Sequence, residues 1–295
     1  METEVSIFFV NFSYHFFILM TTANSELAPL LKWAGGKRSL LKKLLSSLPK
    51  SFDNYCEPFL GGGSLLFALH PQKAIVSDIN FELINLYKVV MKQPEKLIRL
   101  LCTYPNDKDF FYSMRSQDRE DGFDKKTPLE LAARTYYLNR TCFNGLYRLS
   151  KKGYFNSPYG YYKTPFGPNK ERIRAVSAYL NTAGIDIDAC SYETTCNKLQ
   201  KGDFVYLDPP YDLVESHSFV AYNKEVFRQN DQVSLRDLCI DLDSRGVKFL
   251  LSNSATENII SLYKDFKQEL IKAPRYVNPS RKGSGIVSEI LIKNY

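Results

Sequence analysis

The sequence predicts an α/β fold with a mostly parallel sheet that is interrupted by an insertion. In the first and last thirds of the chain, short apolar strand signals alternate with helical signals, a pattern typical of parallel sheets. The middle third instead combines polar helical segments with a stretch rich in Gly, Asn and Tyr. We therefore expect residues 25–92 and 186–295 to form the core and residues 93–185 to form an inserted subdomain.

The first third contains two candidate strands joined through a glycine turn and a helix. Asn54–Leu60 leads into Gly61–Gly63, and the apolar residues from Ser64 onward predict a helix. Lys73–Asp78 is a second short strand, and the spacing of apolar residues in Phe81–Met91 predicts a further helix. This alternation is typical of neighbouring parallel strands.

The middle third lacks sheet signals. Residues 93–119 are polar and helical in character, and Pro128–Asn139 predicts another helix. Thr141–Pro168 is dense in residues that favour turns. We expect this region to carry recognition loops.

Sheet signals return in the last third. Asp203–Asp208 and Val247–Asn253 are expected to be buried strands, and Ala255–Lys264 is expected to be helical. Phe266–Lys272 and Ile286–Ile292 can pair as a terminal hairpin around a loop of Gly, Ser and basic residues.

Charge points to a phosphate-bearing partner without deciding the question. The chain has 295 residues, of which 44% are hydrophobic, which argues against global disorder. Lys and Arg number 39 against 32 Asp and Glu, and this excess of +7 is gathered in three stretches. Basic clusters suit nucleic acid, but they are also common as solvated surface, so both interpretations stay open. The clusters comprise Lys32, Lys37, Arg38, Lys42 and Lys43; Lys151, Lys152, Lys163, Lys170, Arg172 and Arg174; and Arg275, Arg281 and Lys282.

The cysteines and the N-terminus carry weaker signals. The six cysteines form no C-x-x-C pair and the three histidines are far apart, so no zinc site is predicted and a reduced, cytoplasmic setting is expected. Residues 1–24 are expected to be an extension, and one hypothesis is that the natural chain starts at Met20. Ile7–Met20 is too short to cross a membrane, and no membrane association is expected.

The first chemical signal is the run Glu57–Ser64 followed by Asp78. Glycines after a strand allow the backbone to approach a ligand closely, and an acidic residue at the end of the next strand can bind two ribose hydroxyls. The alternative is a tight turn with Asp78 acting as a helix cap. The two features together favour a nucleoside ligand, and the absence of a G-x-x-x-x-G-K-[ST] pattern argues against a phosphate loop.

The second signal is Asp208-Pro209-Pro210-Tyr211, directly after the apolar strand Phe204–Leu207. Two prolines end the strand and stiffen the turn, so that the carboxylate projects from a rigid position. Asp208 and the carbonyl of Pro209 can accept the two N–H bonds of an aromatic amine, and Tyr211 can stack on its ring. The alternative is an ordinary strand-end turn. The third signal is Leu31–Arg38, in which Trp33 and two glycines could close over a small ligand or pack into the core.

These three segments, in this order, resemble the Dam-type DNA adenine methyltransferases, in which the cofactor motif precedes the recognition region and D-P-P-Y follows it. The resemblance covers Leu30 to Tyr295 and is strongest to the DpnII-type GATC methylases. It rests on K-W-A-G-G-K-R, E-P-F-L-G-G-G, the residues from Gly202 to Tyr206, L-S-N-S from Leu251, and G-I-V-S-E-I from Gly285.

The resemblance implies a Rossmann-like methyltransferase sheet of seven strands and S-adenosylmethionine as cofactor, without a metal. It implies methylation of the N6 amine of a flipped adenine in double-stranded DNA, with Asp208, Pro209, Pro210 and Tyr211 as catalytic residues. The implied cofactor site comprises Trp33, Ala34, Gly35, Lys37, Glu57, Pro58, Phe59, Gly61, Gly63, Asp78, Ser191, Tyr192 and Asp208.

The same resemblance implies a base-reading hairpin. Asn144-Gly145 is a strong turn signal, Phe143 can fill the stack that a flipped base leaves, and Arg148 can contact a guanine. The family often has Tyr where this chain has Phe143. The expected DNA-binding residues are Lys32, Arg140, Phe143, Asn144, Gly145, Leu146, Arg148, Pro158, Tyr162 and Arg281.

The sequence leaves some alternatives open. A related core could act on RNA or on a protein amide, and a DNA-binding protein without catalysis would share part of the pattern. GATC follows from resemblance alone, since the EcoRV-type site belongs to a related architecture. A restriction endonuclease could be a functional partner without physical contact.

Overall fold

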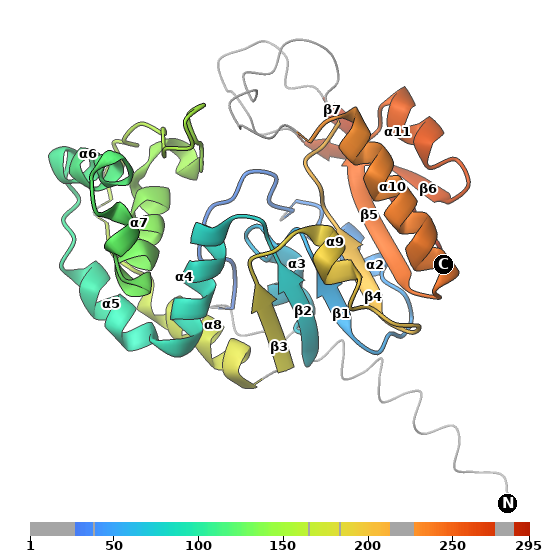
Figure 1. Cartoon of the computed structure of the whole chain (residues 1–295), viewed down its shortest axis with the longest axis horizontal. Coiled ribbons are helices and arrows are strands. Elements are labelled where there is room, and N and C mark those ends of the chain that lie inside the picture. Colours follow the sequence, from blue (N-terminus) through green and yellow to red (C-terminus); the bar gives the residue numbers. More distant parts are fainter. Residues whose placement is uncertain (1–26, 38, 165, 183, 213–226, 275–285) are drawn as a thin grey trace, which may run out of the picture.

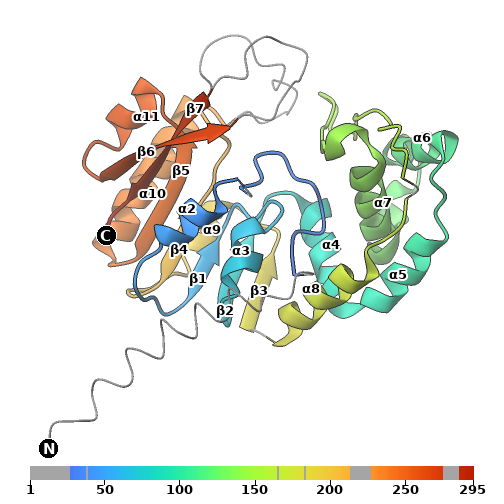
Figure 2. The ribbon, with the colours of Figure 1, turned by 180° about the vertical axis from the view of Figure 1, so that it is seen from behind.

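The computed structural model describes residues 27–37, 39–164, 166–182, 184–212, 227–274 and 286–295. The expected N-terminal extension, the hypothetical start at Met20 and the expected DNA contact Arg281 lie outside these ranges. The described chain contains one seven-stranded sheet in the order β3-β2-β1-β4-β5-β7-β6 (Figures 1 and 2). The strands are β1 Tyr55–Glu57, β2 Lys73–Ser77, β3 Gly184–Asp188, β4 Phe204–Leu207, β5 Lys248–Ser254, β6 Lys267–Pro274 and β7 Ile286–Lys293.

The sheet is mostly parallel, as the sequence predicts. β1 pairs in parallel with β2 and β4, β2 with β3, and β4 with β5. Only β7 runs the other way, antiparallel to β5 and β6, so the predicted terminal hairpin is confirmed. The predicted first strand is shorter than expected because the chain leaves the sheet after Glu57, at Pro58.

Strand β3 was not predicted from the sequence. Its Ile185 and Ile187 are buried, whereas the alternating Asp186 and Asp188 are exposed. This period of two is the signal that could have identified the strand. The expected boundary between insertion and core, at residues 185 and 186, falls within β3, and the division into core and insertion stays a prediction.

Helices cover both faces of the sheet, which forms the middle of three layers. Adjacent residues of one strand enter different hydrophobic clusters: Tyr55 and Tyr206 pack on one face, and Cys56 and Val205 on the other. The described helices are α2 Leu41–Ser46, α3 Ser64–Leu69, α4 Phe81–Lys92, α5 Pro94–Cys102, α6 Lys108–Ser116, α7 Pro128–Thr141, α8 Lys170–Thr182, α9 Tyr192–Cys196, α10 Gln229–Ser244 and α11 Glu257–Leu262. None of these helices is long and apolar enough to cross a membrane.

Short 3₁₀ turns interrupt the middle region. They are η1 Gln117–Arg119, η2 Phe123–Lys125 and η3 Phe143–Gly145. Between the helices α7 and α8 the described residues contain η3 and no strand, only the isolated bridges from Cys142 to Tyr159 and from Leu149 to Phe155. The prediction of helices followed by a turn-rich stretch is therefore confirmed for this region.

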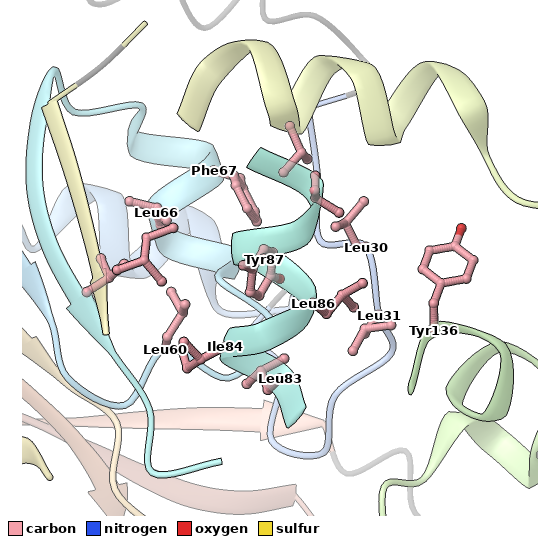
Figure 3. Packing of buried hydrophobic residues seen from close by; sticks show 14 of the residues in the cluster. Leu30, Leu31, Leu60, Leu66, Phe67, Leu83, Ile84, Leu86, Tyr87 and Tyr136 are labelled. Atoms are coloured by element: carbon pink, nitrogen blue, oxygen red, sulfur yellow. The ribbon is translucent and has the colours of Figure 1, made fainter. Parts of the chain in front are cut away.

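Helix α4 joins the sheet to the helical group α5–α8. It begins after Asn80, whose side chain accepts a hydrogen bond from the Leu83 N–H, and it packs against α7, α8 and β3. Figure 3 shows its buried Leu86 and Tyr87 beside Leu30 and Leu31 of the N-terminal segment. The N-terminal segment is thus anchored in the core before it reaches the edge of the sheet.

A buried cation ties the helical group together. Arg134 of α7 is 1% exposed and forms ion pairs with Asp118 at 2.9 Å and Glu82 at 3.3 Å. Its Nε donates to the carbonyl of Met114, and its guanidinium lies over the ring of Phe123. Removing one member of such a buried set leaves charges without compensation in a medium that solvates them poorly.

We expect Arg134→Met to lower the free energy of unfolding by about 3–5 kcal/mol, because Asp118 and Glu82 would lose their buried partner. Arg174→Met is the matched control, since its ion pair with Glu95 joins half-exposed side chains, where screening by water leaves little net stabilisation. Urea unfolding followed by circular dichroism measures both values. Equal effects of the two substitutions would contradict the importance of the buried pairs.

Candidate active site

Most residues singled out in the sequence meet at one edge of the sheet. Because β1, β2, β3 and β4 are parallel, the segments after their carboxyl ends are neighbours. This places the glycine turn after β1, Asp78 after β2, Ser191 and Tyr192 after β3, and Asp208 after β4 side by side (Figure 1). Ligands bind at this edge in open α/β sheets.

The glycine turn is held by the end of β2. Asp78 accepts hydrogen bonds from the N–H of Gly61 and the N–H of Asn80, both at 2.9 Å. Gly61 and Gly63 have φ of 49° and 68°, a region that side chains other than glycine rarely adopt. Burial raises the pKa of Asp78, against the effect of these two hydrogen bonds. The helix cap at this place is Asn80, so Asp78 fixes the turn and keeps unused acceptor capacity on both oxygens.

Aromatic rings line the neighbouring surface. Phe59 stacks on Tyr192, with ring centroids 5.1 Å apart and planes at 24°. Phe227 meets Phe59 edge-on at 6.2 Å. Ile79, directly after Asp78, is 73% exposed. Phe59, Tyr192 and Phe227 together form an apolar surface suited to a flat ring.

The sequence did not identify Phe227 or Ile79 as site residues. Phe227 stands in a polar stretch without a motif, so only its packing on Phe59 and Tyr192 reveals it. The sequence signal that could have pointed to Ile79 is its position directly after Asp78. The predicted Ser191 is the N-cap of α9, and its hydroxyl accepts a hydrogen bond from the Thr194 N–H.

Trp33 lies on the glycine turn. A Cβ atom at Gly61 would meet its ring at 2.9 Å, and one at Gly62 would meet its Cβ at 3.3 Å. The ring also stacks on Tyr147, with centroids 5.1 Å apart. The predicted Ala34 and Gly35 follow as exposed residues. Trp33 is therefore packed between the turn and the middle region of the chain, as well as beside the candidate site.

Glu57 is buried below the turn. It is 3% exposed, and one carboxylate oxygen accepts hydrogen bonds from the Tyr55 hydroxyl at 2.8 Å and the Leu66 N–H at 3.2 Å. Burial raises its pKa to about 8, with smaller contributions from the charges of Asp208 and Asp78. Pro58, which follows, is also buried. Direct ligand contact by Glu57 and Pro58 stays a prediction.

Asp208 is held through one of its two oxygens. Its Oδ1 lies 2.8 Å from Nζ of Lys37 and accepts a hydrogen bond from the Ser252 hydroxyl at 2.8 Å. Ser252 in turn is bonded to the Tyr206 hydroxyl at 3.0 Å, and Lys37 also donates to the carbonyl of Gly35. The sequence singled out Lys37 and Asp208 separately, and the structure brings them together. Oδ2 is the oxygen that these two groups leave for another partner.

The turn after Asp208 is fixed from two sides. Tyr211 donates its hydroxyl to Glu289 at 2.8 Å, and Nζ of Lys37 lies 4.6 Å from the centre of its ring. The carbonyl of Pro210 accepts a hydrogen bond from Gln232 of α10 at 3.1 Å, and Pro209 is buried. These contacts hold the Tyr211 ring next to Asp208. Gln232 and Glu289 are positioning residues that the sequence did not reveal.

Most of the expected recognition residues lie at and beyond the C-terminal end of α7. We call these residues the recognition group: Arg140, Phe143, Asn144, Gly145, Leu146, Arg148, Pro158 and Tyr162. The turn Phe143–Gly145 has positive φ at Asn144 and Gly145, as the sequence signal implies. Phe143 and Leu146 are 50% and 41% exposed. Lys32 reaches this group, because its Nζ lies 4.9 Å from the centre of the Tyr162 ring.

The hairpin that follows is short. The bridge from Leu149 to Phe155 is extended by hydrogen bonds from the Asn156 N–H to the Arg148 carbonyl and from the Ser150 N–H to the Tyr154 carbonyl. Arg148 is exposed, and its Nη2 donates to the carbonyl of Asn156 at 2.9 Å. Pro158 is exposed and Arg140 is half-buried.

Comparison with known proteins finds similar chains. Residues 33–276 match the D12 class N6 adenine-specific DNA methyltransferase family. The chain is 44% identical over 273 residues to the type II methyltransferase M1.LlaDCHI of Lactococcus lactis subsp. cremoris, covering 92% of this chain and 96% of that protein. It is 36% identical over 296 residues to the type II methyltransferase M.MjaIII of Methanocaldococcus jannaschii, covering 92% and 100%. It is 35% identical over 270 residues to the DNA adenine methylase of Serratia marcescens, covering 88% and 96%.

Glu57 should make the stability of the fold depend on pH. Its raised pKa means that the folded state binds the proton more tightly than the unfolded state, so its contribution is full below about pH 4.5 and is lost as pH rises through about 8. We expect wild type to lose stability relative to Glu57→Gln between pH 5 and pH 9, on the order of a few kcal/mol. Urea unfolding of both proteins at each pH measures this, and a difference that does not change with pH would contradict it.

Proposed function

Because the chain belongs to the D12 class of N6 adenine-specific DNA methyltransferases, we propose that it methylates the N6 amine of an adenine flipped out of double-stranded DNA, with S-adenosylmethionine as donor and GATC as target. The observation that carries the proposal is the placement of Asp208. Its carboxylate stands at the carboxyl edge of the sheet, held by Lys37 and Ser252, beside the glycine turn and the aromatic surface.

The residues at the sheet edge fit S-adenosylmethionine. Phe59, Tyr192 and Phe227 offer an apolar surface for its adenine ring, and Asp78 has acceptor capacity for ribose hydroxyls. Gly61 and Gly63 keep the backbone bare where a side chain would collide with Trp33 or Phe67. Lys37 supplies a cation for a carboxylate, and Trp33 lies against Gly61 and Gly62 of the turn. Bound there, the cofactor supplies a methyl group on a positively charged sulfur.

The catalytic turn prepares the amine. Asp208 accepts one hydrogen bond from the adenine amine through Oδ2, and the carbonyl of Pro209 accepts the other, which counters the delocalisation of the nitrogen lone pair into the ring. Tyr211, oriented through its hydroxyl bond to Glu289, stacks on the base. As the nitrogen gains the methyl group it becomes acidic, and Asp208 receives the departing proton.

The recognition group reads the target site in this proposal. Phe143 fills the gap left by the adenine, and the remaining N–H groups of Arg148 contact a guanine. Lys32 contacts a flanking guanine, Pro158 and Tyr162 lie near the thymine methyl group and its phosphates, and Leu146 is a further DNA contact. Arg140 contacts phosphate, and Arg281 belongs to the same proposal although it lies outside the described residues. A restriction endonuclease is proposed as a functional partner only.

The direct test uses the purified chain, a plasmid and tritiated S-adenosylmethionine. The plasmid is then digested with endonucleases that either require or are blocked by adenine methylation in GATC. Label in adenine with altered digestion at GATC is the expected result. Label without altered digestion keeps the chemistry and rejects the site, and an unlabelled plasmid rejects the proposed substrate.

Asp208→Ala should lower the rate of methyl transfer by at least ~100-fold, the scale typical of losing a positioned proton acceptor. Duplex affinity should stay within a few fold, because Asp208 lies apart from the recognition group. Asp186→Ala, which removes an exposed carboxylate of β3, is the control and should be neutral. Retained turnover by Asp208→Ala would overturn the assigned role.

Arg148→Ala should weaken discrimination at a single base pair by about 1–3 kcal/mol, the value of one bidentate contact to a base. The measurement is kcat/KM on GATC and on duplexes changed at one pair at a time. Lys152→Ala, an exposed cation on the same hairpin, should weaken binding to all duplexes alike. The same uniform loss in Arg148→Ala would identify Arg148 as a phosphate contact.

A further inference from the structure

One short segment touches the recognition group, the glycine turn and the catalytic carboxylate. We call Lys32–Lys37 the bridging segment and Phe143–Gly145 the recognition turn. Trp33 lies on Gly61 and stacks on Tyr147, and Lys37, four residues later, forms the ion pair with Asp208. If Lys32 is displaced, the rest of this short segment is displaced with it, including Lys37 beside Asp208.

The Lys32 end is attached to the recognition turn by one buried side chain. Asn139 is 1% exposed, and its amide bonds both backbone groups of Lys32: Oδ1 accepts from the Lys32 N–H at 3.0 Å, and Nδ2 donates to the Lys32 carbonyl at 2.8 Å. Nδ2 also donates to the carbonyl of Gly145 at 3.0 Å. The amide of Asn139 thus joins the recognition turn, through Gly145, to Lys32, which lies 107 residues before Asn139 in the chain.

The recognition turn rests directly on Lys32. A Cβ atom at Gly145 would lie 2.5 Å from Cβ of Lys32, so the turn packs against Lys32 too closely for any side chain at position 145. Next to this contact, Phe143 and Leu146 are exposed and available to DNA. The turn that would meet the bases therefore shares a buried polar junction with the segment that places Trp33 and Lys37.

We infer that Asn139 is a specificity-determining positioning residue, which makes the placement of Lys37 and Asp208 depend on how the recognition turn sits on DNA. The inference rests on the proposed function. Asn139 touches neither DNA nor the reacting atoms. A site that seats the turn correctly keeps the bridging segment in place, and a site with a wrong base pair displaces it through Asn139. Discrimination then arises in the rate of methyl transfer more than in DNA affinity.

The test compares Asn139→Ala with wild type on the duplex that wild type methylates and on a duplex with one changed base pair. We expect the single-turnover rate on the correct duplex to fall roughly 10- to 100-fold, the scale of a misplacement of about 1 Å, and the rate ratio between the duplexes to fall as well. The Kd for the correct duplex should change by less than about threefold, a small part of phosphate-dominated affinity. Asn85→Ala is the matched control, because Asn85 is buried and ties α4 to the carbonyl of Pro128 without touching the bridging segment. It should leave the ratio unchanged.

A second readout follows the bridging segment itself. Trp33 is the single tryptophan of the chain, so its fluorescence reports this segment. Its emission should differ between the two duplexes in wild type and in Asn85→Ala, and should be the same in Asn139→Ala. If Asn139→Ala does not fold, Asn139→Ser replaces it, since the shorter side chain cannot make the three hydrogen bonds of the amide to Lys32 and Gly145.

An unchanged rate ratio in the folded variant, or a loss confined to Kd, overturns the inference. So does Trp33 emission in wild type that is the same on both duplexes. These outcomes differ from a failure of the proposed function, in which wild type itself would not methylate DNA.

Discussion

The parallel pairing of β1 with β2 on one side and with β4 on the other is the constraint on which the site depends. Parallel strands end at one edge, and their backbone carbonyls and N–H groups are already used in the sheet. The segments that leave this edge must therefore find their partners in each other. This is why Asp78 accepts from the N–H of Gly61 and why the N–H of Leu60 donates to the carbonyl of Ser77. The turn after β1 also requires glycines, because it passes close to the rings of Trp33 and Phe67.

Three carboxylates crowd this edge, and the protein stabilises each in a different way. Glu57 is buried, forms no ion pair within the part of the chain that the structure describes, and has a pKa raised to about 8 by burial, so it favours its protonated form near neutral pH. Asp78 keeps its place by accepting backbone hydrogen bonds. Asp208 is paired with Lys37 and held by Ser252. Only Asp208 combines a cation with an oxygen that these partners do not use, which distinguishes it as the carboxylate suited to receive a substrate amine.

Side-chain contacts tie the middle region, residues 93–185, to the sheet and the segments around it. Arg134 links α7 to α4 through Glu82, whose carboxylate also accepts from the Tyr147 hydroxyl. Tyr147 stacks on Trp33 and so reaches the glycine turn. Polar and aromatic contacts of this kind hold a defined geometry better than an apolar surface does, because their partners must be aligned as well as close. The recognition group and the sheet edge are thereby kept in register.

The sequence by itself determined the alternation of strands and helices, the glycine turn and the rigid turn at Asp208. Each is a local requirement, since positive φ selects glycine and two prolines end a strand wherever they occur. Only the tertiary structure decided which groups meet: Lys37 with Asp208, Phe227 with Phe59, and Asn139 with Lys32. The roles of Ser252 and Glu289 also became visible only there. These contacts join residues far apart in the chain, and the identity of a side chain says nothing about a partner that only the strand order brings within reach.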